Sequence, residues 1–233
     1  MSARQMALAL EYRPARGRAD FLVSGSNRAA MEAIEGWAGW PGRRMALVGP
    51  ARAGKSHLGA VWSALSGAAT VEALALDPAR VDALAGAPLV VEDVPALAEL
   101  DDPAPAESAL LHLHNALYER GHALLLTGRT APGHWQAYLP DLASRLAALP
   151  TVRIEAPDER LLASVLLKLA ADRQIVLPPA VVSYIVPRME RSLAAAERLV
   201  TALDRASLAA RRPVTRPLAA SILEALAEPP ADR

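Results

Sequence analysis

The sequence predicts an α/β fold with a parallel sheet of five strands, followed by a small domain made only of helices. Up to Pro157, short apolar segments alternate with helical ones, which is typical of parallel strands joined by crossover helices. After Pro157 the strand-like segments stop and only helical segments follow. In addition, a glycine-containing loop separates the first expected strand from the first helix of the alternating part, an arrangement typical of phosphate-binding folds.

The expected strands are short and mostly apolar. They cover residues 43–48, 70–76, 88–93, 122–127 and 152–154. Between them, residues 55–66 and 105–120 have helical character, and Leu110, Leu113 and Leu117 recur on one side of the second of these helices. These segments together predict the α/β core.

Four further helices are expected at the C-terminal end, over residues 158–172, 178–188, 191–211 and 217–226. The first of them opens on an acidic cap, Asp158. The sequence therefore predicts three parts: a flexible N-terminal tail (1–19), an α/β nucleotide-binding domain (20–157) and a helical domain (158–233).

Composition limits the function classes. Of the 233 residues, 52% are hydrophobic, which is enough for a substantial core, and the formal net charge is zero, which gives no global electrostatic case for nucleic-acid binding. The chain has no cysteine, which excludes disulfides and thiolate metal sites. No apolar run reaches membrane-spanning length and no signal peptide is evident, so we expect no membrane partner and a cytoplasmic location.

A phosphate-binding loop (P-loop) pattern, Gly49-x-x-x-x-Gly54-Lys55-Ser56, lies between the first strand and the following helix. Glycines let the backbone turn its N–H groups toward a phosphate, and the helix dipole favours an anion at the same place. Lys55 is one of only two lysines in the chain, the other being Lys168, and a compact ammonium suits the β- and γ-phosphates. The expected ligand is ADP or ATP, held by Gly49, Pro50, Ala51, Arg52, Ala53, Gly54, Lys55, Ser56 and His57.

Acidic and polar residues end two of the expected strands. Glu92 and Asp93 close the third strand, and Thr127 closes the fourth. Ser56 and Glu92 are the predicted Mg²⁺ ligands, Asp93 is the predicted activator of water, and Thr127 is placed to sense the γ-phosphate. The usual order is aspartate and then a second acid, so the order here argues against efficient intrinsic hydrolysis. A solvated strand end and a turn residue are the alternative interpretations.

The segment from Asp20 to Ala30 resembles the F-x-V-G-x-x-N-R segment that precedes the P-loop in the DnaA family of bacterial initiators. The P-loop, Glu92–Asp93 and residues 125–129 and 141–146 follow in that family's order. The resemblance covers about residues 20–226 and implies an AAA+ core with a lid domain, with Leu22 and Val23 contacting the nucleotide. The chain has no DNA-binding helix-turn-helix after the lid, so it is most similar to the short Hda-type relatives of DnaA.

The N-terminal residues Gln5, Met6, Leu8 and Leu10 resemble the hexapeptide by which partners dock on the replicative sliding clamp. Apolar side chains that fill pockets, together with one side-chain amide that can form hydrogen bonds, suit the binding of an extended peptide. The segment departs from the family pattern by Met6 in place of leucine and Ala9 in place of proline. An added edge strand is the alternative interpretation.

Two further positions follow from the resemblance. Arg145 matches the arginine finger, a permanent cation that stabilises phosphoryl-transfer charge at a neighbouring subunit's nucleotide; a surface arginine is the alternative. Ala194 stands where the family carries the lid's sensor arginine, with Arg191 and Arg198 one turn to either side. This departure again argues against autonomous ATP turnover.

The resemblance implies a regulator that, with the DNA-loaded clamp, stimulates hydrolysis of DnaA-bound ATP and thereby inactivates the initiator. Its partners would be DnaA and the clamp, with DNA reached only through the clamp. A homodimer is a further possibility that the resemblance leaves open. The alternative is an autonomous P-loop ATPase of the helicase-loader type.

Overall fold

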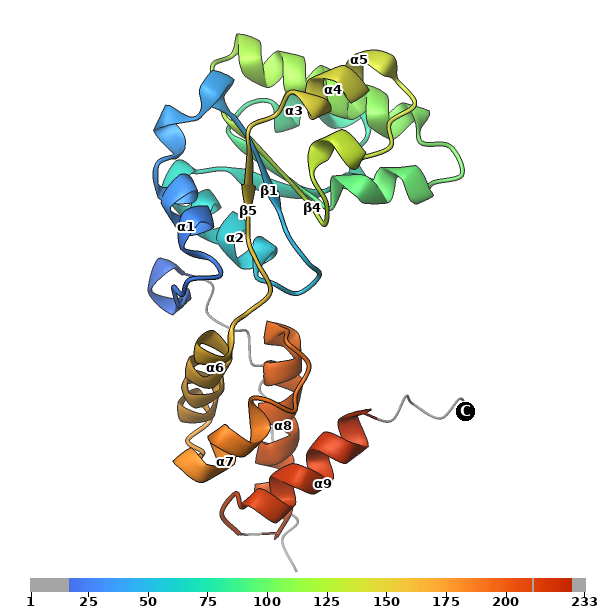
Figure 1. Ribbon diagram of the computed structural model, residues 1–233. Coiled ribbons are helices and arrows are strands. Elements are labelled where there is room, and N and C mark those ends of the chain that lie inside the picture. The colour runs from blue at the N-terminus through green and yellow to red at the C-terminus, as the bar shows by residue number, and fades with distance from the viewer. Residues whose placement is uncertain (1–16, 211, 228–233) are drawn as a thin grey trace, which may run out of the picture.

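A computed structural model describes residues 17–210 and 212–227, so the predicted clamp-binding residues Gln5, Met6, Leu8 and Leu10 lie outside the described part. An α/β body stands above a group of four helices, and one connecting segment after β5 joins the two (Figure 1). The predicted fold class, a five-stranded parallel sheet followed by a helical lid, is confirmed.

The five parallel strands lie in the order β2-β3-β4-β1-β5. Their bounds are β1 (Arg44–Val48), β2 (Ala69–Glu72), β3 (Leu89–Glu92), β4 (Leu124–Gly128) and β5 (Thr151–Arg153). The P-loop strand β1 is therefore flanked by β4 and β5, and β3 with its acidic end lies next to β4. All these strands end at the same edge of the sheet, so the residues that follow them meet there.

Helices cover both faces of the sheet. They are α1 (Arg28–Glu35), α2 (Lys55–Ser66), α3 (Val81–Leu84), α4 (Ala104–Glu119) and α5 (Pro140–Ala147). Strand side chains alternate between the faces: Met45 and Leu47 pack with α1 and α2, whereas Ala46 and Val48 pack with α4 and α5. Trp62, with no exposed surface, stacks on Trp40 with ring centroids 5.1 Å apart.

The lid has its own apolar core, made by α6 (Glu159–Asp172), α7 (Pro179–Ile185), α8 (Leu193–Ala210) and α9 (Arg216–Ala227). Asp158 caps α6 as predicted, because its Oδ1 accepts the Leu161 N–H at 2.7 Å. None of the helices in the described part of the chain is long and apolar enough to span a bilayer.

The predicted second strand, 70–76, is too long. β2 ends at Glu72 and a 3₁₀ turn, Ala73–Ala75, follows. β2 is an edge strand whose neighbour is β3, and their register ends at the pair Glu72 and Glu92. Asp93 then takes a left-handed conformation with φ of 53° and ends β3, so β2 has nothing left to pair with.

Candidate functional site

The P-loop needs its two glycines for different reasons. Gly54 adopts φ of 108°, a conformation that suits glycine, and begins α2 as its N-cap. Gly49 passes so close to the end of β5 that a Cβ would overlap the Ile154 carbonyl oxygen and lie 2.5 Å from the Ile154 Cγ2. The loop therefore turns tightly between β1 and the N-terminus of α2, where the backbone can hold an anion.

Lys55 lies inside this loop. Its Nζ donates hydrogen bonds of 2.9 Å to the carbonyl oxygens of Gly49 and Pro50. Burial lowers the pKa of Lys55, and the nearby carboxylates of Asp93 and Glu92 partly oppose that shift. The ammonium is thus held near the loop by weak, neutral acceptors, which a phosphate oxygen can replace.

The two predicted magnesium ligands lie together. The Ser56 hydroxyl donates to Oε2 of Glu92 at 3.1 Å, although 36 residues separate them. No group of three or more His, Cys, Asp and Glu side chains in the described residues could hold a metal ion. A hydroxyl and one carboxylate nevertheless fit Mg²⁺, which usually takes one or two protein ligands together with phosphate oxygens and water.

Asp93 and Thr127 are also neighbours. The Asp93 N–H donates to the Thr127 Oγ1 at 3.0 Å, and Thr127 is buried. This contact joins the ends of β3 and β4 and holds Asp93 in its left-handed conformation. Arg129, which the sequence did not single out, lies near enough to Lys55 to contribute to the lowering of its pKa.

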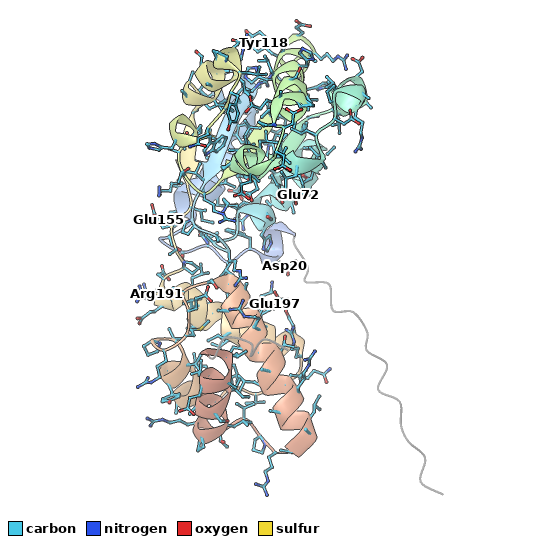
Figure 2. The ribbon with its side chains drawn as sticks, turned by 90° about the vertical axis from the view of Figure 1, so that its right-hand side faces the viewer. Asp20, Glu72, Tyr118, Glu155, Arg191 and Glu197 are labelled. Carbon is cyan, nitrogen blue, oxygen red and sulfur yellow. The ribbon has the colours of Figure 1, made fainter. Side chains whose placement is uncertain are left out.

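A cavity of about 310 Å³ opens between the P-loop, the segment before α1, and the lid. Its predicted wall residues are Leu22, Arg52, Gly54, Lys55, Ser56 and His57. Gly49, Pro50, Ala51 and Ala53 belong to the loop but do not line the cavity, and neither does Val23, which is 39% exposed. Figure 2 shows Asp20 at the lower edge of the α/β body and Glu197 at the facing end of the lid.

The sequence alone did not predict most of the lid residues that line the cavity. These are Leu161, Val165, Lys168, Leu169, Asp172, Leu193 and Glu197. Three residues before α1 also line it and were not predicted as nucleotide contacts: Asp20, Phe21 and Asn27. Asn27 fixes its segment by accepting the Ser24 N–H at 2.8 Å and donating to the Leu22 carbonyl at 2.9 Å. Asp20, Phe21 and Asn27 lie in the segment that resembles the DnaA family, but no local pattern marks the lid residues.

The cavity combines apolar walls with a polar rim. The ring of Phe21 meets that of His57 edge-on, with the ring centroids 5.1 Å apart, and five aliphatic lid residues face the same space. Lys168 Nζ contacts the Asp20 carboxylate at 2.6 Å on the rim. A space with apolar walls beside a phosphate loop can accommodate a heterocyclic base attached to a phosphate chain.

Ala194 lines the cavity at the place expected for the sensor arginine. The two candidate substitutes lie elsewhere, since neither Arg191 nor Arg198 lines that space. Their guanidinium groups pair with Glu159 at 3.1 Å and Glu190 at 3.0 Å. In the described structure, the only lid cation that lines the cavity is therefore Lys168.

Arg145 is not part of this cavity. It lies on α5, which Figure 1 places on the side of the α/β body far from the lid. Its side chain is 38% exposed, and its Nε donates to Asp141 Oδ1 at 3.1 Å, one helical turn earlier. The structure thus brings Lys55, Ser56, Glu92, Asp93 and Thr127 together and keeps Arg145 apart from them.

Residues 158–223 match the family model of the Hda lid domain. The chain is also similar to the crystal structure of domain III of the replication initiation protein DnaA from Thermotoga maritima. Identity is 18%, the match covers 93% of this chain and 99% of that one, and the TM-score is 0.77.

Two other solved structures show the same fold. AMPPCP-bound DnaA from Aquifex aeolicus is 17% identical with a TM-score of 0.65, and the match covers 78% of this chain and 63% of that one. The RuvB Holliday junction branch migration motor of Thermotoga maritima is 14% identical with a TM-score of 0.69, covering 91% and 72%.

Proposed function

We propose that this chain is an Hda-type, DnaA-related AAA+ protein that inactivates the initiator DnaA by stimulating hydrolysis of the ATP bound to DnaA; the match of its lid to the Hda lid domain and its DnaA-like fold support this proposal. In this proposal the chemistry takes place in the partner's nucleotide site. This chain supplies an arginine to that site and is brought there by a sliding clamp loaded on DNA.

The observation that carries the proposal is the position of Arg145. It lies on the surface of α5, outside the cavity beside the chain's own P-loop, so it is not placed to act on a nucleotide bound in that cavity. Its 38% exposure leaves the guanidinium accessible to another molecule. A permanent cation with several donors suits the charge that develops on a transferred phosphoryl group.

The chain's own cavity would hold ADP or ATP with Mg²⁺ as a ligand that joins the body to the lid. Lys55 would contact the phosphates, and Ser56 and Glu92 would hold the ion, which neutralises phosphate charge when bound. AMPPCP bound to the similar DnaA fold supports this assignment. Alanine at position 194 and the order Glu92–Asp93 favour slow turnover, so the nucleotide would mainly stabilise the arrangement of the two domains.

The body would be residues 20–157 and the lid residues 158–233, with the joint near Pro157. The preceding tail would dock on the clamp through Gln5, Met6, Leu8 and Leu10. Because the tail joins the body close to Asp20, docking would bring the α/β body to the DNA that carries the clamp. A cytoplasmic location follows from these partners.

The test is a reaction containing DnaA preloaded with labelled ATP, the sliding clamp on DNA, and the purified protein. The expected result is faster conversion of bound ATP to ADP, which depends on the clamp and is lost when Gln5, Leu8 and Leu10 are all changed to alanine. An unchanged rate on addition of the protein would rule the proposal out. Substantial ATPase activity of the isolated protein would favour the alternative, an autonomous ATPase of the helicase-loader type.

A further inference from the structure

A buried carboxylate lies beside the start of the helix that carries Arg145. Glu107 belongs to α4 and has no exposed surface. Its two oxygens accept the Tyr138 N–H at 2.9 and 3.0 Å, and its Oε2 also accepts the Leu139 N–H at 2.9 Å. Residue 107 thus holds a backbone segment more than 30 residues further along the chain.

These contacts complete the N-terminus of α5. Leu139 is the N-cap of that helix and has no capping side chain of its own, and Pro140 has no N–H. The two backbone donors just before Pro140 are both bound by Glu107, a group supplied by a different helix. A carboxylate at this end also interacts favourably with the helix dipole.

The apolar face of α5 is fixed by packing. Leu142 and Leu146 are buried in the same apolar core as Leu110 and Leu113 of α4. Packing of this kind sets the distance between α4 and α5. Because the contacting side chains form a single stripe, it restricts movement of α5 along its own axis less. The hydrogen bonds from Tyr138 and Leu139 to Glu107 are directional and restrict that movement.

From these contacts, and resting on the proposed function, we infer that Glu107 is the positioning residue of Arg145. It sets the position of the N-terminus of α5, and therefore where the guanidinium, five residues after Pro140, meets the partner's nucleotide. Glu107 does not touch that nucleotide and acts only through the helix. A residue that only stabilises the fold would not lower the maximal stimulated rate while leaving the half-maximal concentration and the affinity for ADP unchanged.

The test substitutes glutamine, which keeps the shape of the side chain and removes one of the two good acceptors. In Glu107→Gln, the maximal stimulated rate of hydrolysis of DnaA-bound ATP should fall between about tenfold and a hundredfold, as expected for a small misplacement of a catalytic group. The protein concentration that gives half-maximal stimulation and the affinity for ADP should stay within about twofold. Glu119→Gln, at the exposed end of the same helix, is the matched control.

A further measurement separates positioning of α5 from a general loss of stability. Hydrogen exchange in the substituted protein should be faster at the amides of Tyr138, Leu139 and residues 141–147, and unchanged in β3 and β4. Unchanged exchange at these amides, or an unchanged maximal rate in the Glu107→Gln variant, would overturn the inference.

Failure of the proposed function gives a different result. If the wild-type protein does not stimulate hydrolysis, the proposed function is wrong and a role for Glu107 in it falls as well. The exchange measurement then still decides whether Glu107 anchors α5, because it needs neither DnaA nor the clamp.

Discussion

Lys168 Nζ lies 2.6 Å from Oδ1 of Asp20 and 3.1 Å from the Asp20 carbonyl oxygen, so one lysine joins the lid helix α6 to the segment that precedes α1. Both side chains are about a quarter to a third exposed, and both line the cavity beside the P-loop. The hydrogen bond from Lys168 lowers the pKa of Asp20 below 3.8. The Asp20 carboxylate is therefore ionised at neutral pH, and its contact with Lys168 is lost only as pH falls below that value.

We predict that Lys168→Met speeds the release of ADP, because the lid loses its ionic contact with the body across the cavity. Dissociation of a fluorescent ADP measured by stopped flow should become about twofold to fivefold faster, the range expected of a partly exposed ion pair. Arg160→Met on the exposed side of α6 is the control and should leave the rate unchanged. Equal rates for wild type and Lys168→Met would show that the contact does not hold the lid.

Gly49→Ala should remove nucleotide binding and destabilise the α/β body. The added Cβ overlaps the Ile154 carbonyl oxygen, so either the loop or the end of β5 must move. Overpacking of this kind costs about 1–3 kcal/mol. Urea unfolding and ADP titration measure the two effects. Gly133→Ala, where an added Cβ meets nothing within 4 Å, is the matched control.

Magnesium dependence tests the pair formed by Ser56 and Glu92. In Ser56→Ala and in Glu92→Gln, the gain in ADP or ATP affinity on adding Mg²⁺ should shrink by at least about tenfold, because a ligand of the ion is lost. The affinity in EDTA should change little. Ser63→Ala, on the same helix with its hydroxyl near Thr70, should behave as wild type. A full Mg²⁺ effect in both variants would contradict the assignment.

Acid should weaken the fold through His114. Burial, and then the nearby cations Arg44 and Arg145, lower the pKa of this imidazole from 6.5 to about 4. The unfolded chain therefore binds a proton that the folded chain does not between those two values. The contribution of neutral His114 to the free energy of unfolding should be complete above about pH 6.5 and should decline as pH falls toward 4.

Chemical denaturation at a series of pH values measures this decline. In His114→Asn the slope between pH 6.5 and 4 should be smaller than in wild type, whereas His112→Asn, exposed on the same helix, should keep the wild-type slope. Identical slopes in all three proteins would show that His114 is not the titrating group.

Local patterns predicted the parts of the site that one segment can specify. The helix predicted over 55–66 has the bounds Lys55–Ser66 in the structure, because glycines in left-handed conformations, Gly54 and Gly67, lie just outside both its ends. The meeting of Ser56 with Glu92 followed from the parallel sheet, in which strand ends share one edge.

Contacts between distant segments could not be predicted in the same way. Lys168 lies 148 residues from Asp20, and its sequence context is that of any amphipathic helix. Helix α5 was not predicted, because only eight residues form it and its first backbone donors are bound by Glu107 from another helix. The ends of β2 and β3 likewise depend on the conformation of Asp93, which Thr127 stabilises from the next strand.

The most direct test of action on a partner's nucleotide is a single-turnover measurement on DnaA preloaded with labelled ATP, in the presence of clamp-loaded DNA. Arg145→Ala should remove the stimulation while clamp binding and ADP binding stay intact. Arg120→Ala is the matched control, since Arg120 is 41% exposed and paired with Asp82 much as Arg145 is 38% exposed and paired with Asp141. Full stimulation by Arg145→Ala, or equal loss in both variants, would contradict a role for Arg145 at the nucleotide of DnaA.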